Sequence, residues 1–257
     1  MKGCMAALAL SLTFGAGCMA EPGQEQGVAI DEQGEALQVM NGLIDINGLS
    51  ARNGLSARNG LSARNGLNTE TGLSSTTGLM TSADGRMTVS YMVRCALPTG
   101  HTLTKKDQYG NIYKYPGQIG IGAGWETGVC DTNCQEWISA CMMSLVNTAG
   151  IHVPLWMVAQ NTQIGLGQNS TYPLQEGSFF GNIFLSPPQA YYCGGRNYGA
   201  DVVQGRIGAS QTNAPYVDPW GAAANCDIYC TATDYPHQLD GYKACYGFNN
   251  VITIWRQ

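Results

Sequence analysis

Charged side chains are scarce in this sequence. They make up 12% of its 257 residues, and the net charge is −5, whereas typical soluble domains carry roughly 25%. Lysine and arginine form no cluster, and nucleic-acid binding needs such clusters to neutralise phosphates. We therefore expect no nucleic-acid partner. The length of the chain is sufficient for one domain with a sizeable core and a tail.

Long apolar runs are also missing, because no segment after the first residues reaches the roughly 20 apolar positions that span a bilayer. The one short run, 5–14, follows Lys2 and precedes small residues, as in a signal peptide. The residues 15–18, GAGC, resemble the lipobox of bacterial lipoproteins, which implies a lipid on Cys18, although Gly15 stands where leucine is usual. Cleavage after Ala20 is the alternative. We expect an exported protein, either a cell-envelope lipoprotein held to the membrane through residue 18 or a secreted one.

Ten cysteines are present, of which two lie in the leader. The other eight form an even set in an exported chain, which predicts four disulfides: Cys95, Cys130, Cys134, Cys141, Cys193, Cys226, Cys230 and Cys245. Structural zinc is less favoured, because the close pairs have C-x3-C rather than C-x2-C spacing. We predict the pairs Cys95–Cys141 and Cys230–Cys245, and the remaining connectivity stays open.

A six-residue repeat dominates the segment that follows the leader. Asn-Gly-Leu begins at 41, 47, 53, 59 and 65, and Thr-Gly-Leu begins at 71 and 77. Asn-Gly favours turns, and the segment 19–86 has no aromatic residue. The pattern predicts an acidic tether and flexible spacer that the domain at 87–257 does not need for folding. A short β-solenoid packed on the domain is the alternative.

The domain itself is predicted as mainly β (α+β), with disulfide bonds and one main helix at about 133–147. Apolar residues recur there at spacings of three and four, and Asn133 with Glu136 has the form of a capping box. Runs rich in β-formers predict strands at 88–97, 151–159, 179–185, 190–193, 202–207 and 250–256, and a hairpin at 102–115. Pro154 predicts that its strand lies at an edge.

Catalytic motifs are few. Only three histidines occur, and no G-x-S-x-G elbow is present. The best cluster is Asp234, His237 and Asp240, in which the histidine could act as a general base or all three residues could bind a metal. A solvated polar loop is the alternative, and we expect neither a metal nor another cofactor.

Aromatic residues give the better functional hypothesis. Tyr191, Tyr192, Tyr198, Tyr216 and Trp220 gather between 186 and 225, and prolines fix the backbone around 213–220. Rigid rings beside polar groups are typical of contact surfaces for sugars or peptides. We therefore predict Tyr216, Asp218 and Trp220 as binding residues, with core filling as the alternative for the aromatic set.

Four features of the sequence belong together: the hexapeptide repeat, SYMVRCALP at 90–98, CQEWISAC at 134–141 and EGSFFGNIF at 176–184. Together they resemble a group of cysteine-rich predicted bacterial lipoproteins. The resemblance implies export and a disulfide-bonded fold, but no activity.

Two hypotheses of function remain. One is a surface binding or structural module for an extracellular glycan or protein. The other is a secreted hydrolase of polysaccharide or peptide that uses His237 with Asp234 and Asp240.

Overall fold

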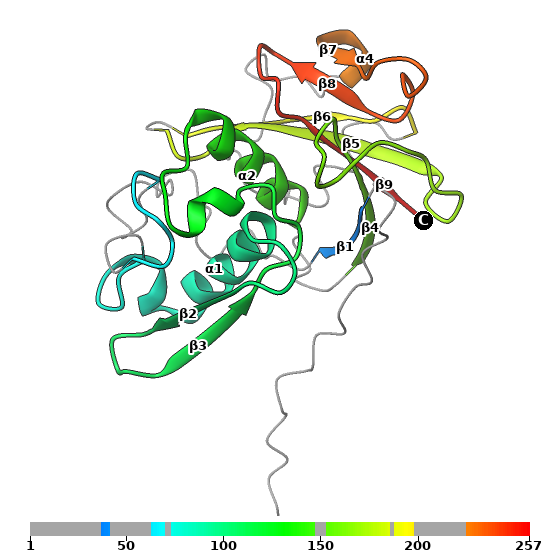
Figure 1. Ribbon diagram of the computed structural model, residues 1–257. Helices are drawn as coiled ribbons and strands as arrows, with labels where there is room; N and C mark the ends of the chain where they lie inside the picture. The colour runs from blue at the N-terminus through cyan, green and yellow to red at the C-terminus, as the bar shows by residue number, and fades with distance from the viewer. Residues whose placement is uncertain (1–36, 42–62, 70–72, 147–152, 186–187, 198–224) are drawn as a thin grey trace, which may run out of the picture.

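The structure is a computed structural model that describes residues 37–41, 63–69, 73–146, 153–185, 188–197 and 225–257 (Figure 1). Helices lie on one side of a central sheet, and a small disulfide-bonded unit lies on the other side. The predicted class, a β-rich domain with disulfides, is confirmed. No helix in these ranges is long and apolar enough to cross a membrane.

The central sheet has five antiparallel strands in the order β1-β4-β9-β5-β6. Their bounds are Leu37–Asn41 for β1, Val153–Val158 for β4, Ile252–Arg256 for β9, Leu174–Asn182 for β5 and Gln189–Gly194 for β6. The prediction of an edge position for Pro154 is wrong, because β1 pairs with β4 on the side away from β9. That pairing was unexpected, since β1 comes from the segment interpreted as a tether.

Helix α2, Thr132–Ser144, covers one face of β5 and β9 and confirms the predicted main helix. Its buried residues include Ile138, Cys141 and Met142. The predicted capping box is wrong. The helix begins one residue earlier, and the Asp131 side chain accepts a hydrogen bond from the Cys134 amide at 2.9 Å.

The predicted strand at 88–97 is wrong, because this stretch belongs to a second long helix, α1, Ala83–Ala96. Its valines and tyrosine favour strands when each is considered singly. However, Val89, Met92, Val93 and Ala96 are all buried, and their spacing of three and four residues puts them on one helical face. The Ser82 hydroxyl accepts from the Gly85 amide at 3.0 Å and caps the helix.

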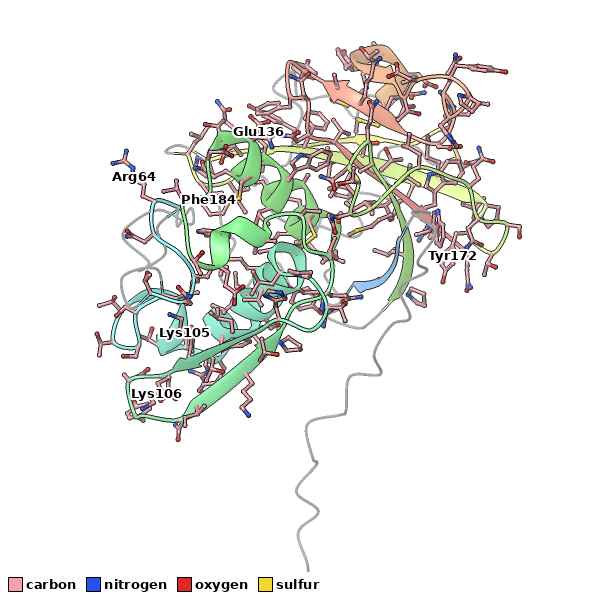
Figure 2. All side chains as sticks on the ribbon, viewed as in Figure 1. Arg64, Lys105, Lys106, Glu136, Tyr172 and Phe184 are labelled. Carbon is pink, nitrogen blue, oxygen red and sulfur yellow. A yellow bond between two sulfur atoms is a disulfide. The ribbon has the colours of Figure 1, made fainter. Side chains whose placement is uncertain are left out.

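The predicted hairpin is confirmed as β2, Thr102–Lys106, paired with β3, Ile112–Pro116. In Figure 2, Lys105 and Lys106 mark its position beside α1, at the end of the molecule away from β7 and β8. The side chain of Asp107 fixes the turn, since its carboxylate accepts the amides of Tyr109 and Asn111.

The last repeats are part of the core, so the boundary at Met87 is wrong. Leu67, Leu73 and Leu79, which are six residues apart, are all buried beside α1 and α2. The amide of Leu67 donates to the carbonyl of Trp125 at 2.8 Å, in the short 3-10 helix η4, Ala123–Glu126. A Cβ at Gly66 would lie 2.6 Å from a backbone atom of Thr127, so only glycine allows this contact. Neither a free spacer nor a β-solenoid describes residues 63–69 and 73–86.

Residues 225–250 form a unit that we call the C-terminal lobe. It contains α4, Cys226–Tyr229, and the two-stranded ribbon of β7, Cys230–Ala232, and β8, Tyr242–Cys245. The lobe packs on the sheet face opposite α2, around Phe180 and Val251. All eight domain cysteines are paired, as Cys95–Cys141, Cys130–Cys134, Cys193–Cys226 and Cys230–Cys245. Both predicted pairs are confirmed.

Candidate functional site

The C-terminal lobe carries the features that most resemble a functional site. Its ribbon has two ends with different chemistry. At one end, the loop between β7 and β8 holds the predicted cluster around His237. At the other end, α4 and the turn after β8 hold a group of aromatic rings. The two ends are separated by the short paired strands, so they form two surfaces.

His237 and Asp240 come together, as the sequence predicted. The Nδ1 atom of His237 lies 2.7 Å from Oδ2 of Asp240, whose side chain is only 8% exposed. The backbone carbonyl of Asp240 accepts the indole N–H of Trp255 at 2.8 Å, which holds the backbone of Asp240 against the sheet. The imidazole is 43% exposed. A buried carboxylate therefore orients an accessible imidazole, which is the arrangement of a general base and its orienting acid.

Asp234 does not join this pair. Its carboxylate accepts hydrogen bonds from the Lys243 ammonium group and from Nε2 of Gln160. The bond from Lys243 is the main reason that the pKa of Asp234 is lowered. The structure thus separates the predicted cluster into a His237–Asp240 dyad and an exposed ion pair. Among the described residues, the only group of three or more side chains placed to share a metal ion consists of cysteines.

The predicted binding residues Tyr216, Asp218 and Trp220 lie outside the described residues. So does the predicted strand at 202–207. Of the aromatic set between 186 and 225, Tyr192 is buried against the helices, as in the core-filling interpretation, whereas Tyr191 lies on the opposite face and is half-buried.

An aromatic patch surrounds Tyr191. We use this name for four residues from three segments: Tyr191 on β6, Tyr229 on α4, and Tyr246 and Phe248 after β8. Tyr246 contacts two of them, with ring centroids 6.4 Å from Tyr191 and 5.2 Å from Tyr229 and planes within 27° of parallel. The buried ring of Phe180 lies beside the patch. Tyr229 is 38% exposed and the other three are half-buried, so the patch reaches solvent.

The backbone at Tyr246 has an unusual conformation. Its φ is 54°, and Gly247 follows with φ 84°. The amides and carbonyls of Cys245 and Phe248 bond each other at 2.8 Å, which closes a two-residue turn. Such turns favour Asn, Asp or Gly at the first position. A bulky residue in the left-handed region costs of order 1–3 kcal/mol, and such residues cluster at functional sites. Tyr246 adopts this conformation with its ring in the patch.

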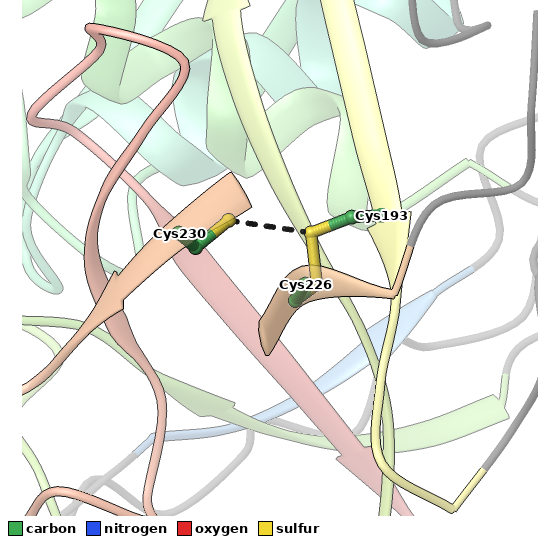
Figure 3. Close-up of side chains that lie close together, drawn as sticks. All are labelled: Cys193, Cys226 and Cys230. Atoms are coloured by element: carbon green, nitrogen blue, oxygen red, sulfur yellow. Dashed lines mark hydrogen bonds between the residues drawn. A yellow bond between two sulfur atoms is a disulfide. The ribbon is translucent and has the colours of Figure 1, made fainter. Parts of the chain in front are cut away.

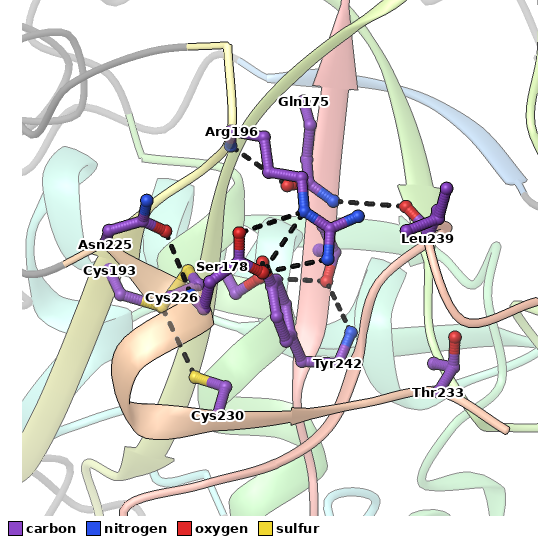
Figure 4. Close-up of polar contacts among 12 residues, drawn as sticks. Gln175, Ser178, Cys193, Arg196, Asn225, Cys226, Cys230, Thr233, Leu239 and Tyr242 are labelled. Atoms are coloured by element: carbon purple, nitrogen blue, oxygen red, sulfur yellow. Dashed lines mark hydrogen bonds and ion pairs between the residues drawn. A yellow bond between two sulfur atoms is a disulfide. The ribbon is translucent and has the colours of Figure 1, made fainter.

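Polar contacts hold α4 in place (Figure 4). The guanidinium of Arg196 binds the carboxylate of Asp227 with contacts of 2.8 to 3.1 Å, and the Tyr242 hydroxyl donates to the same carboxylate at 2.7 Å. Arg196 lowers the pKa of Asp227 by hydrogen bonding, and burial raises the pKa of Tyr242. Gln175 accepts the backbone amide of Arg196 at 3.1 Å, so the network reaches the sheet.

The sequence pointed to only part of this site. Tyr191 was singled out because it lies in a region rich in aromatic residues, and the pair at 237 and 240 stood out by spacing. Tyr229, Tyr246 and Phe248 were missed, although the predicted Cys230–Cys245 pair brings Tyr229 and Tyr246 together. Their approach to Tyr191 depends on Cys193–Cys226, a pair that the sequence did not reveal. The pair Tyr246-Gly247 between Cys245 and Phe248 was the available signal, since glycine in a short turn indicates positive φ.

No family model, curated protein or solved structure matches this chain.

Proposed function

We propose that the protein is an exported, lipid-anchored module that binds an extracellular glycan through the aromatic patch. The observation that carries this proposal is the group of nearly parallel, solvent-reaching rings of Tyr191, Tyr229 and Tyr246. Rigid aromatic rings offer a large apolar area at low entropic cost, while tyrosine hydroxyls offer hydrogen bonds. A sugar ring presents the same combination of apolar faces and hydroxyl edges.

The immediate surroundings of the patch fit this ligand class. Asn249 is exposed directly after Phe248, and Asn225 is exposed directly before α4. Amide groups can both donate to and accept from sugar hydroxyls. Arg196, the cation that binds α4, is already engaged by Asp227. The patch therefore offers neutral hydrogen-bonding groups, which favours a neutral polysaccharide over an acidic one.

The test is binding of the full mature, disulfide-bonded chain to immobilised neutral polysaccharides, measured against two variants. Tyr229→Ala removes a ring, and we expect about thirtyfold weaker binding, since hot-spot aromatics contribute about 2 kcal/mol. Tyr246→Asn removes a ring but introduces a residue that accepts positive φ. We therefore expect it to lose affinity to a similar degree while its melting temperature changes little.

Tyr109→Ala is the matched control, because this tyrosine is 81% exposed in the turn between β2 and β3, at the other end of the molecule. It should leave glycan binding unchanged. Equal affinity of the parent, Tyr229→Ala and Tyr246→Asn would refute the patch as the contact surface.

The second part of the proposed contact surface consists of Tyr216, Asp218 and Trp220. The prolines at 215 and 219 restrict the backbone of this segment, so less entropy would be lost on binding. Trp220→Ala in the same assay is expected to weaken binding by about thirtyfold. If Trp220→Ala binds like the parent while the patch variants do not, the contact surface is confined to the patch.

Lipid anchoring is tested separately. Mass spectrometry of the mature N-terminus should find a diacylated Cys18, and Cys18→Ser should release the protein from membranes. An unmodified N-terminus at Glu21 would instead indicate ordinary cleavage after Ala20. The glycan-binding proposal does not depend on which result is found.

A second candidate function rests on the His237–Asp240 dyad. Nδ1 of His237 faces a buried carboxylate, while the imidazole stays accessible, as a hydrolase requires of its general base. If the protein cleaves polysaccharide or peptide, His237→Ala should abolish the activity and Asp240→Asn should reduce it strongly. Asp234→Asn should have little effect, because Asp234 is bound to Lys243 instead. Cleavage that survives His237→Ala would exclude this dyad.

A further inference from the structure

Four cysteines of the C-terminal lobe and its supporting strand lie close together, although they come from four different elements. Figure 3 shows three of them, Cys193, Cys226 and Cys230. They form two disulfides, Cys193–Cys226 and Cys230–Cys245. The two disulfides touch, since the Sγ atoms of Cys193 and Cys230 are 3.6 Å apart. The Sγ atoms of Cys193, Cys226 and Cys230 all lie within 4.8 Å of one another. We call these four residues the sulfur cluster.

We propose that the sulfur cluster is a redox-gated metal site: a thiol reductant opens both disulfides, and the four thiolates then bind one zinc ion. The oxidised form described above is the closed state of this site. The inference is independent of glycan binding, because it concerns the sulfur atoms that support the lobe and not its surface.

The spacing of the sulfur atoms is suitable for zinc. Zn–S bonds of about 2.3 Å in a tetrahedron put the sulfur atoms roughly 3.8 Å apart. The non-bonded pair, Cys193 and Cys230, is already at 3.6 Å. The Sγ atoms of Cys193, Cys226 and Cys230 already lie within 4.8 Å of one another, and Cys245 is bonded to Cys230. After reduction, Cys245 would have to turn toward the other three sulfur atoms. The backbone therefore brings three ligands to a common centre and holds the fourth beside them.

The burial of the cluster makes a metal more favourable than four free thiolates. Cys193, Cys226 and Cys245 are buried, and Phe180 and Val251 pack around them. Several thiolates in such surroundings repel each other and lose hydration, whereas zinc neutralises part of their charge and takes up their lone pairs. Cys230 is half-buried, so reductant and metal can reach the cluster from its side.

The chemistry balances as follows. Each of the two disulfides receives two electrons and two protons from two thiol groups of the reductant, which are oxidised to a disulfide. Zinc then binds the four sulfur atoms and releases their four protons to solvent. Because binding releases protons, zinc affinity should rise with pH.

The chain contains an internal control. Cys130 and Cys134 have the same C-x3-C spacing as Cys226 and Cys230, but they bond each other across the start of α2. No third metal-ligating side chain among the described residues joins them. Cys95 and Cys141 are likewise a single pair. If metal binding requires four cysteine sulfur atoms that lie close together, it should therefore occur only in the lobe.

The test uses the full chain, reduced without oxygen by a water-soluble phosphine. One equivalent of zinc is added, and all thiols are then alkylated and mapped by mass spectrometry. We expect alkylation of the sulfur cluster to slow at least tenfold. The four other domain cysteines, Cys95, Cys130, Cys134 and Cys141, should react at the same rate with and without zinc. With cobalt in place of zinc, a thiolate-to-metal charge-transfer band should saturate at one equivalent.

Two double variants complete the design. Cys130→Ser/Cys134→Ser should keep the cobalt band and the protection, whereas Cys226→Ser/Cys245→Ser should lose both. The proposal is overturned if zinc protects no cysteine, protects all eight equally, or still binds as tightly in Cys226→Ser/Cys245→Ser. If reduction unfolds the chain and zinc then restores neither circular dichroism nor protection, the proposal is also refuted.

Discussion

The two sides of the central sheet are stabilised in different ways. On the helical side, α1, α2 and the last hexapeptide repeats bury a continuous apolar core. One long-range disulfide, Cys95–Cys141, lies inside this core and joins the two helices. On the other side, the C-terminal lobe has a smaller cluster of buried residues, half of them cysteines.

Element length explains this difference. Helices of 14 and 13 residues have faces that can bury many side chains against a sheet. The elements of the lobe have four, three and four residues, and such short segments cannot bury enough apolar surface to stay ordered by themselves. Two disulfides and the Arg196–Asp227–Tyr242 network take over that role. The lobe can thus expose aromatic rings and still be rigid.

The largest effect should come from removing the repeats, which belong to the helical side. Deletion of residues 19–86 would remove the buried side chains of Leu67, Leu73, Leu79 and Met80. At about 1.5–3 kcal/mol each, this loss is comparable with the whole stability of a typical domain, about 5–15 kcal/mol. We expect the truncated chain to show no cooperative thermal transition in calorimetry.

A shorter deletion is the control for this experiment. Removing only residues 42–58 keeps β1 and the buried leucines, and its melting temperature should stay closer to that of the parent than to that of the large truncation. An unchanged melting temperature in the 19–86 deletion would mean that the helical side does not need its repeats.

The next largest effect is expected from Cys95→Ser/Cys141→Ser. This disulfide closes a sequence separation of 46 residues, for which loop-closure entropy gives about 4 kcal/mol. Since the helices keep their apolar contacts, we expect a lower denaturation midpoint with a retained single transition. Near-ultraviolet circular dichroism should stay native-like at low temperature. Loss of that signal would show that the disulfide, rather than burial, holds the helical side together.

The helical side was the more predictable half, although one large error was made there. The helix at α2 was found because Trp137, Ile138, Cys141 and Met142 repeat at helical spacing. The helix at α1 was missed because β-branched residues were weighted above the spacing of Val89, Met92, Val93 and Ala96. The period of burial was the stronger signal, and local propensity the weaker one.

The repeats and the site show where single-sequence reasoning ends. The glycine-rich hexapeptides look like a spacer, because nothing in their composition shows that Leu67 meets η4 from a distant part of the chain. In the lobe, the pair His237–Asp240 was found by its spacing within one loop. The aromatic patch was not, because Tyr191 and Tyr246 meet only through pairing of strands and cysteines far apart in sequence.

A smaller and local effect is expected from Cys230→Ser/Cys245→Ser in the lobe. A separation of 15 residues gives a loop-closure contribution of about 3 kcal/mol to the free energy of unfolding. Loss of this contribution should destabilise the lobe before it affects the sheet and helices. We expect amide hydrogen exchange to accelerate in β7 and β8 while the protection of α1 and α2 stays unchanged. Equal acceleration in α2 would show that the two sides unfold as one unit, which would remove the contrast between them.

The smallest effect should come from the ion pair of the lobe, through pH. Hydrogen bonds from Arg196, and then from Tyr242, hold the pKa of Asp227 below its usual value of 3.8, against the opposing effect of burial. A lowered pKa in the folded state means that the contribution is fully present above roughly pH 4 and is lost as the pH falls through the folded pKa. Asp227 is 41% exposed, so the pair should contribute only about 0.2–1 kcal/mol.

We expect hydrogen exchange in β8 of the parent to show an added loss of protection below pH 4, beyond the intrinsic pH dependence of exchange. Asp227→Asn should lack this step and show slightly lower protection at pH 6. If the step persists in Asp227→Asn, another carboxylate controls the acid stability of the lobe, and its polar network contributes less than its disulfides and packing.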